Sequence, residues 1–231
     1  MKKALPLILM ICLLLVGCSK EAQVPATAET VPATTTAPEA TVAAEPMEAP
    51  NVISPLPDST MENMADAVLS VSLSEGDAYV DDTGKMQMDV TVYSYDKYDM
   101  VDISMLKAGD VLVTSAGEVE IVSIERKENG TVLINGGLDE NGFDLVTDES
   151  GIFYESGYND AKNWYEVGKA TIRVSADFTF CDTSDLDAGE ILYYPGSFLV
   201  GEVTNYNFTP FNTTIRIEDG QIIEMHRVYT P

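Results

Sequence analysis

The residues best suited to binding chemistry lie in one short stretch of the chain, between positions 153 and 165. This stretch holds several aromatic rings, the only tryptophan in the chain, and interspersed amide and carboxylate groups. Flat rings stack on sugars and peptides at low entropic cost, while Asn and Asp side chains bond to hydroxyl groups. A second interpretation stays open, in which the same rings close one end of a β-barrel as part of its core. The candidate ligand-binding residues are Tyr154, Tyr158, Asp160, Asn163, Trp164 and Tyr165.

Nucleophilic catalysis has few candidate residues. Beyond the first eighteen residues the chain holds one cysteine, Cys181, and one histidine, His226. The run Thr179-Phe180-Cys181 resembles the approach to the cysteine in sortase-like transpeptidases, but that family places its histidine before the cysteine, which is the reverse of the order here. No G-x-S-x-G elbow accompanies the histidine. Because free cysteine is among the most buried residue types, we interpret Cys181 as a packed residue and assign no catalytic residue.

Carboxylates are abundant, with 38 Asp and Glu residues, but their number does not show which of them meet. A facing pair about 5 to 10 Å apart would suit a glycosidase-like hydrolase, and this alternative stays open. The best metal candidate is a loop with oxygen ligands at Asp139, Asn141 and Asp144. It departs from the EF-hand pattern because Phe143 stands where a ligand is needed and Asp144 where glycine is needed. We favour an ordinary polar turn over a calcium site, and the sequence predicts no cofactor.

The charge balance excludes some partners. The formal net charge is −25, with 13 Lys and Arg against 38 Asp and Glu. Nucleic-acid binding needs cationic groups that neutralise phosphate, so we predict no nucleic-acid partner. Such a charge also keeps the folded part of the chain away from anionic lipid headgroups.

The first eighteen residues carry a targeting pattern. Two lysines precede an apolar run that closes with Leu15-Val16-Gly17-Cys18. This ending resembles the lipobox of bacterial lipoprotein signal peptides, which implies cleavage of residues 1–17 and attachment of diacylglycerol to Cys18. A permanent membrane helix is the alternative, but the apolar run is shorter than the roughly 20 residues that spanning requires. The resemblance implies a membrane partner, bound through the acyl chains on Cys18, and a location on the outer face of the plasma membrane.

The chain then divides into a tether and a domain. Residues 18–57 are rich in Ala, Pro, Thr and Glu and lack aromatic residues. Such a segment buries too little apolar surface to offset its ordering entropy, which predicts a disordered tether. Residues 58–231 contain all the aromatic residues together with many β-branched ones and predict an extracytoplasmic domain.

Period-two alternation predicts that this domain is mainly β, as an antiparallel barrel or a sandwich. The alternation runs through 86–92, 119–122 and 213–217. The pairs Asn129-Gly130 and Asp219-Gly220 predict two hairpins with type I′ turns. Two short helices are expected, at Met61 to Leu69 and at Asn159 to Val167.

An internal repeat is visible at an offset of 80 residues. Residues 102–112 match residues 182–192, with six identical positions, and each copy leads into an apolar alternation. A duplication would give two pseudo-symmetric β units, with repeats at about 86–165 and 166–231. The alternative is chance, because L-x-x-G-D followed by apolar residues is a common way to enter a strand.

Taken together, these features predict a lipid-anchored cell-envelope protein that displays a non-enzymatic β module for binding or interaction. The expected ligand is an envelope glycan, peptide or protein. Two alternatives stay open: an envelope hydrolase that uses paired carboxylates, and a structural protein of wall or assembly.

Overall fold

The computed structural model describes residues 49–158, 161–184, 191–202 and 206–230. The predicted signal peptide, Cys18 and most of the predicted tether therefore lie outside the described residues. All of the described residues belong to one structural unit. A search of these residues finds no helix with the length and apolar character needed to cross a membrane.

The described chain is mainly β, as the sequence predicts. Its α-helices are α1 (Met100–Met105) and α2 (Gly196–Glu202), and its 3₁₀ turns are η1 (Met64–Asp66) and η2 (Leu138–Glu140). The strands are β1 (Val52–Ile53), β2 (Ala67–Ser72), β3 (Ala78–Val80), β4 (Met86–Ser94), β5 (Lys97–Tyr98), β6 (Val111–Thr114), β7 (Gly117–Glu120), β8 (Ile124–Arg126), β9 (Val132–Ile134), β10 (Phe143–Thr147), β11 (Phe153–Ser156), β12 (Tyr165–Thr183), β13 (Leu192–Pro195), β14 (Thr213–Glu218) and β15 (Gln221–Val228).

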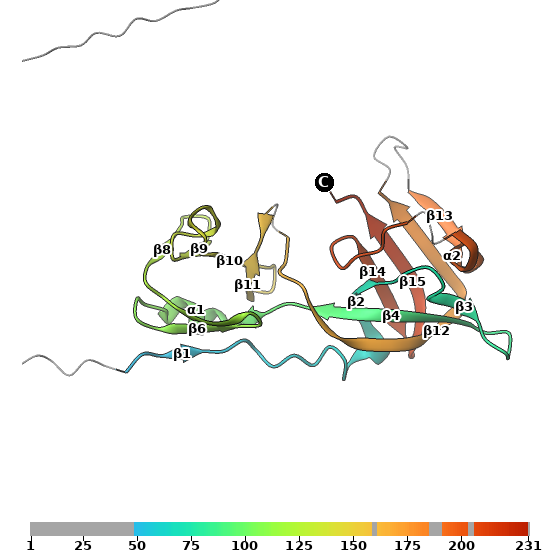
Figure 1. Cartoon of the computed structure of the whole chain (residues 1–231), viewed down its shortest axis with the longest axis horizontal. Coiled ribbons are helices and arrows are strands. Elements are labelled where there is room, and N and C mark those ends of the chain that lie inside the picture. Colours follow the sequence, from blue (N-terminus) through green and yellow to red (C-terminus); the bar gives the residue numbers. More distant parts are fainter. Residues whose placement is uncertain (1–48, 159–160, 185–190, 203–205, 231) are drawn as a thin grey trace, which may run out of the picture. The chain divides into compact units, whose positions relative to one another are not determined.

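Five strands close into a barrel in the order β12-β15-β14-β2-β4, and β4 pairs back with β12. The long strand β12 makes this closure possible, because its first half pairs with β4 and its second half with β15 (Figure 1). The β12–β15 pairing is parallel and the other four are antiparallel. The predicted barrel is thus confirmed, with one parallel pairing in an otherwise antiparallel ring.

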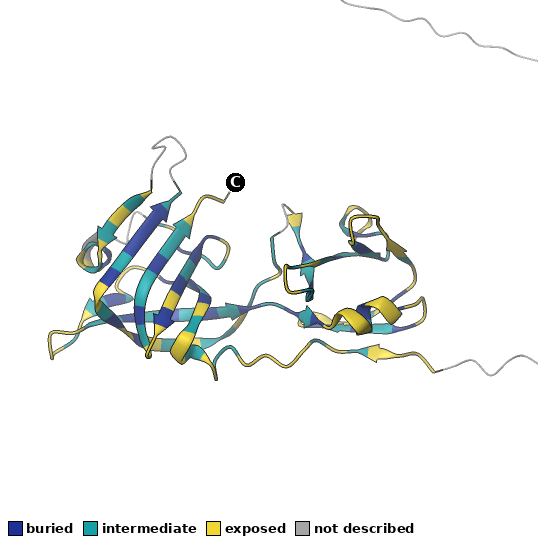
Figure 2. Cartoon of the chain, turned by 180° about the vertical axis from the view of Figure 1, so that it is seen from behind, coloured by how far each residue is buried: buried dark blue, intermediate teal, exposed yellow. Residues whose placement is uncertain are grey.

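The barrel interior follows from the alternation in the sequence. In β4 every second residue is buried, from Met88 through Val90 and Val92 to Ser94, and in β14 Thr213, Ile215 and Ile217 are buried in the same way. Figure 2 shows this alternation as buried and less buried segments along each strand. Because successive side chains of a strand point to opposite faces, one face fills the barrel and the other remains partly exposed.

Both predicted hairpins are present, with different turns. In the β14–β15 hairpin Asp219 and Gly220 have φ values of +49° and +71°, as a type I′ turn requires. In the β8–β9 hairpin only Gly130 has a positive φ, and the N–H of Lys127 donates to the carbonyl of Thr131 over 2.8 Å. The type I′ prediction is therefore wrong for this hairpin, whose three-residue loop needs a left-handed residue only at its last position.

A second core lies outside the barrel. A five-stranded sheet, β5-β11-β10-β9-β8, and a three-stranded sheet, β1-β6-β7, contribute to it together with α1. β1 and Leu56, whose N–H donates to the carbonyl of Lys97, fall inside the segment assigned to the tether. The buried members of the second core are Tyr98, Ile103, Leu106, Leu112, Ile121, Val132, Ile134, Leu145 and Phe153.

Neither predicted helix forms in the described residues. Of Met61–Leu69 only the single turn η1 is helical, and β2 begins at Ala67, because Leu69 and Val71 alternate into the barrel core between β4 and β14. Of residues 159–167, Asn159 and Asp160 lie outside the described residues and the segment from Tyr165 onward belongs to β12. Pairing across the barrel overrides the weak helical propensity of these short segments.

The two copies of the internal repeat differ where both are described. Asp102 lies in α1, whereas its counterpart Asp182 lies in β12. Both copies lead into a strand, β6 or β13. Residues 185–190 of the second copy lie outside the described residues, so the duplication stays a prediction.

Candidate ligand-binding site

The candidate site begins where β4 runs out of the barrel. The alternation of β4 continues beyond its end, so that Asp96 and Tyr98 are buried while Tyr93, Tyr95 and Lys97 are less buried. Residues two apart on an extended chain share a face. This short run therefore presents two tyrosine rings and one ammonium group on the same side.

The start of β12 brings a second set of side chains to this face. Tyr165 pairs with Ser94, which places the preceding residue, Trp164, beside Tyr95. The two rings meet edge to face with their centroids 5.1 Å apart. This is a favourable geometry for aromatic rings, because the positive edge of one meets the negative face of the other.

Lys162 lies among three aromatic rings, those of Tyr95, Tyr154 and Trp164. A bridge to Ser156 sets its backbone position, and next to it the N–H of Gly157 donates to the carbonyl of Ala161 over 2.6 Å. Its Nζ is 4.0 Å from the ring centroid of Tyr95, 5.2 Å from that of Tyr154 and 5.6 Å from that of Trp164. The ring faces attract the ammonium group, and they hold a flexible side chain in one place.

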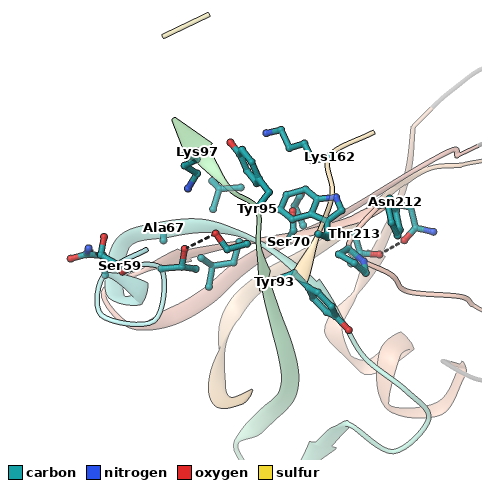
Figure 3. Close-up of a pocket in the computed structure, with 18 of the residues that line it drawn as sticks. Ser59, Ala67, Ser70, Tyr93, Tyr95, Lys97, Lys162, Asn212 and Thr213 are labelled. Carbon is teal, nitrogen blue, oxygen red and sulfur yellow. Dashed lines mark hydrogen bonds between the residues drawn. The ribbon is translucent and has the colours of Figure 1, made fainter. Parts of the chain in front are cut away.

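Two depressions open around Trp164, with volumes of about 580 Å³ and about 650 Å³. They share Lys162, Trp164, Phe211 and Val228, and we treat them together as the Trp164 site. Figure 3 shows Lys97 and Lys162 on either side of Tyr95 in the first depression. Its described lining is Pro57, Ser59, Thr60, Asn63, Ala67–Ser70, Tyr93–Tyr95, Lys97, Lys162, Trp164, Pro210–Thr214 and Val228; the second adds Tyr158, Ala161, Asn207, Thr209, Tyr229 and Thr230.

The opposite wall is a turn before β14. The buried side chain of Asn212 accepts from the N–H of Thr209 over 2.9 Å and donates to the carbonyl of Asn207 over 2.9 Å. These bonds fix the turn, which leaves the ring of Phe211 53% exposed. Tyr229, which follows β15, is 50% exposed. The wall thus offers rings on a rigid support.

The predicted ligand-binding residues are partly brought together. Tyr154 and Trp164 lie against Tyr95, and Tyr158 is 77% exposed at the rim of the second depression. Asp160 lies outside the described residues. Asn163 and Tyr165 line neither depression.

Asn163 and Tyr165 bond to acidic side chains. The Nδ2 of Asn163 donates to Glu155 over 3.3 Å, and the hydroxyl of Tyr165 donates to Asp58 over 3.3 Å. Burial, together with the charges of Asp58 and Asp96, raises the pKa of Tyr165 to about 12. Its hydroxyl therefore stays protonated near neutral pH and acts as a hydrogen-bond donor. These two residues support the site rather than line it.

Sequence reasoning missed several residues of the site: Tyr93, Tyr95, Lys97, Lys162, Phe211 and Tyr229. The alternation carried past residue 92 would have predicted an outward face at 93, 95 and 97. No local pattern marks Phe211 and Tyr229, because they reach the site only through the barrel.

The acids nearest to the site do not line it. Burial raises the pKa of Glu155, an effect opposed by the hydrogen bond from Asn163 and increased by the charge of Asp96. The carboxylate of Asp96 accepts from the N–H of Ser115 over 2.6 Å. A depression elsewhere has Asp77 and Asp89 in its described lining, but both carboxylates accept bonds, from the N–H of Ser74 and the hydroxyl of Thr171. Each of these acids has a structural partner.

Cys181 and His226 are register partners on β12 and β15, but they do not form a nucleophile–base pair. The thiol of Cys181 donates to Glu224 over 3.4 Å, and the imidazole of His226 lies 3.5 Å from the hydroxyl of Thr183. Burial, with the hydrogen bond to Glu224, raises the pKa of Cys181 to about 11. A thiol in this setting is a poor nucleophile at neutral pH.

The loop proposed for calcium is a structured turn. Asp144 accepts from the N–H of Leu138 over 3.0 Å, and Asn141 has a φ of +64°. Among the described residues no group of three or more Asp, Glu, His or Cys side chains gathers in a way that could hold a metal ion. Calcium binding at Asp139, Asn141 and Asp144 stays a prediction, and Asp144 already accepts a hydrogen bond within the turn.

Comparisons of this chain with protein-family models, with curated proteins and with solved structures found no match. The geometry of the Trp164 site is therefore the observation that bears on function.

Proposed function

We propose that this chain is a lipid-anchored cell-envelope protein whose β domain binds a ligand at the Trp164 site without transforming it. The observation that carries the proposal is a ring of exposed aromatic side chains around a hollow. Tyr158, Phe211 and Tyr229 are all at least half exposed, and Trp164 lies between the two depressions. Exposed rings that surround a hollow are typical of ligand-binding surfaces, whereas a core would have enclosed them.

The polar groups of the site favour a ligand with many hydroxyls, such as an envelope glycan. Ser59, Thr60, Ser70 and Thr214 supply hydroxyl groups, and Asn63 supplies an amide. Sugar hydroxyls exchange hydrogen bonds with such groups while the apolar face of the sugar stacks on a ring. A peptide is the second ligand class, since rings and amides also accommodate extended backbones.

The absence of acidic residues from the described lining favours binding over hydrolysis at this site. A glycosidase-like mechanism needs two carboxyls that face the substrate. The described lining offers lysines and hydroxyls instead. A purely structural role predicts that no ligand occupies the two depressions. A fluorescence titration therefore distinguishes this role from ligand binding.

Trp164 is the only tryptophan in the chain, so its fluorescence reports on the site directly. We expect a saturable change when the full-length chain, purified in a neutral detergent, is titrated with a panel of envelope glycans and peptides. The affinity of each variant is then measured by calorimetry, which does not depend on the tryptophan. Trp164→Ala is expected to weaken binding about tenfold or more, since buried aromatic anchors dominate such contacts.

Tyr193→Ala is the matched control, because Tyr193 is a 63% exposed ring on β13 and does not line the Trp164 site. It should leave affinity unchanged. Emission that no member of the panel moves and that acrylamide cannot quench would identify the aromatic cluster as core and reject the proposed function.

The lipid anchor has an independent test. Cells that express the chain and are fed an alkyne-labelled fatty acid should label it through Cys18, and Cys18→Ala should abolish both the label and partition into detergent. Retained labelling in that variant would contradict the lipobox interpretation.

A further inference from the structure

We propose that the ligand of the Trp164 site is anionic: a carbohydrate or polyol that carries carboxylate or phosphate groups, held by Lys97 and Lys162. This inference rests on the proposed function and names its ligand class. It is carried by the local charge of the site, which is opposite to that of the chain as a whole.

The chain is strongly acidic, but the described lining of the site is not. Asp and Glu make up 38 of the 231 residues, about one in six, against 13 Lys and Arg. None of the twenty described residues that line the first depression is acidic, and two are lysines. The described lining of the second depression is also free of acids and shares Lys162. A surface with average composition would have placed several carboxylates here.

The two lysines flank a single ring. Lys97 Nζ lies 4.8 Å from the centroid of Tyr95, and Lys162 Nζ lies 4.0 Å from it. Figure 3 shows the two ammonium groups approaching Tyr95 from either side. Because the two ammonium groups lie on either side of the ring, a ligand that carries more than one anionic group can place one group against each of them and offset their mutual repulsion.

Neither ammonium group has a carboxylate within ion-pair distance in the described part of the chain. Contacts with the ring faces orient the two lysine side chains, but these contacts are not conventional hydrogen bonds. Each ammonium group carries three N–H donors, and these remain for a ligand oxygen. The lysines are therefore positioned before the ligand arrives, which lowers the entropic cost of binding.

Acids near the site reduce its positive potential without removing it. Burial acts to raise the pKa of Asp58, but hydrogen bonds from Ser94 and Thr60 and the nearby charge of Lys97 together lower it. Lys162 contributes in the same sense to the lowered pKa of Asp148, behind the larger effect of the hydrogen bond from Ser150. Direct contact with an ammonium group outweighs these more distant charges, because the Debye length is only about 8 Å at physiological ionic strength.

The test compares matched charged and neutral probes on the full-length chain in neutral detergent, by calorimetry. An oligogalacturonate and its methyl ester share one sugar backbone and differ in charge and in one methyl group per esterified carboxyl, and poly(glycerol phosphate) and inorganic phosphate represent the phosphate source. At low ionic strength we expect the oligogalacturonate or poly(glycerol phosphate) to bind about tenfold more tightly than the methyl ester. That advantage should shrink between about 50 mM and about 500 mM salt. Whichever charged polymer binds more tightly identifies carboxylate or phosphate as the preferred group.

Variants link this preference to the lysines. Lys97→Gln and Lys162→Gln should each weaken binding of the charged probe about three- to tenfold and leave the methyl ester unchanged. Lys97→Arg should restore most of the loss. Lys85→Gln, at an exposed turn before β4, is the matched control and should have no effect. The ammonium group of Lys97 contacts the ring of Tyr95, whereas that of Lys162 contacts three rings, so the Lys97 variant remains informative if Lys162→Gln disturbs the ring cluster.

The outcomes separate this inference from the proposed function. If neither the oligogalacturonate nor the poly(glycerol phosphate) binds more tightly than the methyl ester, and Lys97→Gln changes no affinity, the anionic ligand is overturned and the binding module stands. Tighter binding of a choline-bearing probe, with displacement of Lys162 from the rings, would overturn it in favour of a cationic ligand. No response to any probe would overturn both.

Discussion

The barrel and the second core are stabilised in different ways. In the barrel, long alternating strands close on themselves and bury a large apolar cluster in which Phe180, Met225 and Ile215 are fully enclosed. In the second core most strands have two to five residues, and polar side chains satisfy the backbone between them. Closure removes the free edges that short sheets retain.

Outside the barrel, individual polar side chains form hydrogen bonds with backbone groups. Arg126 donates to the carbonyls of Ile103, Ser104 and Leu106 over 2.9 to 3.1 Å, at the end of α1. The carboxylate of Asp110 accepts from the N–H groups of Asn51 and Lys107, each over 3.0 Å. The barrel should therefore respond most to lost apolar volume, and the second core to lost hydrogen-bond acceptors and donors.

The largest effect is expected from Phe180→Ala in the barrel. The fully buried ring stacks with Tyr194 and Phe198 and meets Tyr206 and Phe208 edge to face. Removing it should lower the free energy of unfolding by about 3 to 5 kcal/mol, measured by urea denaturation. Tyr193→Ala, at an exposed ring, is the control. A loss below about 1 kcal/mol would show that apolar packing does not dominate the barrel.

The next largest effect is expected in the reactivity of the Cys181 thiol, which lies where β12 pairs with β15. Because the pKa of Cys181 is raised from 9.0 to about 11, its thiolate is about a hundredfold scarcer at pH 8 than in the unfolded chain. Alkylation by iodoacetamide, in a chain with Cys12→Ser and Cys18→Ser, should be slower by at least that factor when folded. Equal rates in native buffer and in urea would show that the pairing of β12 with β15 opens or that the thiol is free.

In the second core we expect Asn135→Ala to cost about 2 kcal/mol. Its Oδ1 accepts from the N–H groups of Val122 and Ser123 over 2.7 and 3.1 Å, its Nδ2 donates to the carbonyl of Glu120, and its φ is +54°. Alanine loses the bonds and is strained at this φ. Asn135→Gly separates the two causes, because glycine removes only the bonds. If both variants unfold like the wild type in urea, the polar account of this core is wrong.

The smallest effect concerns pH and Glu155. Burial raises the pKa of Glu155 above its unfolded value of 4.5. A carboxyl with a raised folded-state pKa favours the folded state at pH values below the unfolded pKa, and this contribution is lost as pH rises through the folded pKa. Glu155→Gln should therefore raise the free energy of unfolding at pH 7 slightly, with the gain disappearing below about pH 4. A variant destabilised equally at pH 4 and pH 7 would show that the hydrogen bond from Asn163 matters more than the charge.

Local patterns in the sequence predicted the strands where one face is clearly buried. The alternation in β4 and β14, and the Asp219-Gly220 turn between β14 and β15, need no information from distant parts of the chain. The helix expected at Met61 to Leu69 was wrong because its last residues form a barrel strand. A short segment has too little intrinsic preference to resist such pairing.

The candidate site was predictable in part for the same reason. Tyr154, Tyr158 and Trp164 are close in sequence, and their composition was compatible with a binding surface or with a plug of the barrel. Tyr95 lies about sixty to seventy residues earlier and meets them only because β12 pairs with β4. Phe211 precedes β14 and Tyr229 follows β15, and the pairing of these two strands brings both rings to the site.

The sequence by itself determined the mainly β character of the domain, the two hairpins and the aromatic stretch, since each depends on neighbours within a few residues. Only the tertiary structure decided that the ring closes through a parallel β12–β15 pairing. It also decided that Lys97 and Lys162, separated by 65 positions in the numbering, flank one tyrosine in a hollow whose described lining has no acidic residue. Local patterns specify which face of a strand is buried, but only pairing between distant strands specifies which side chains share the other face.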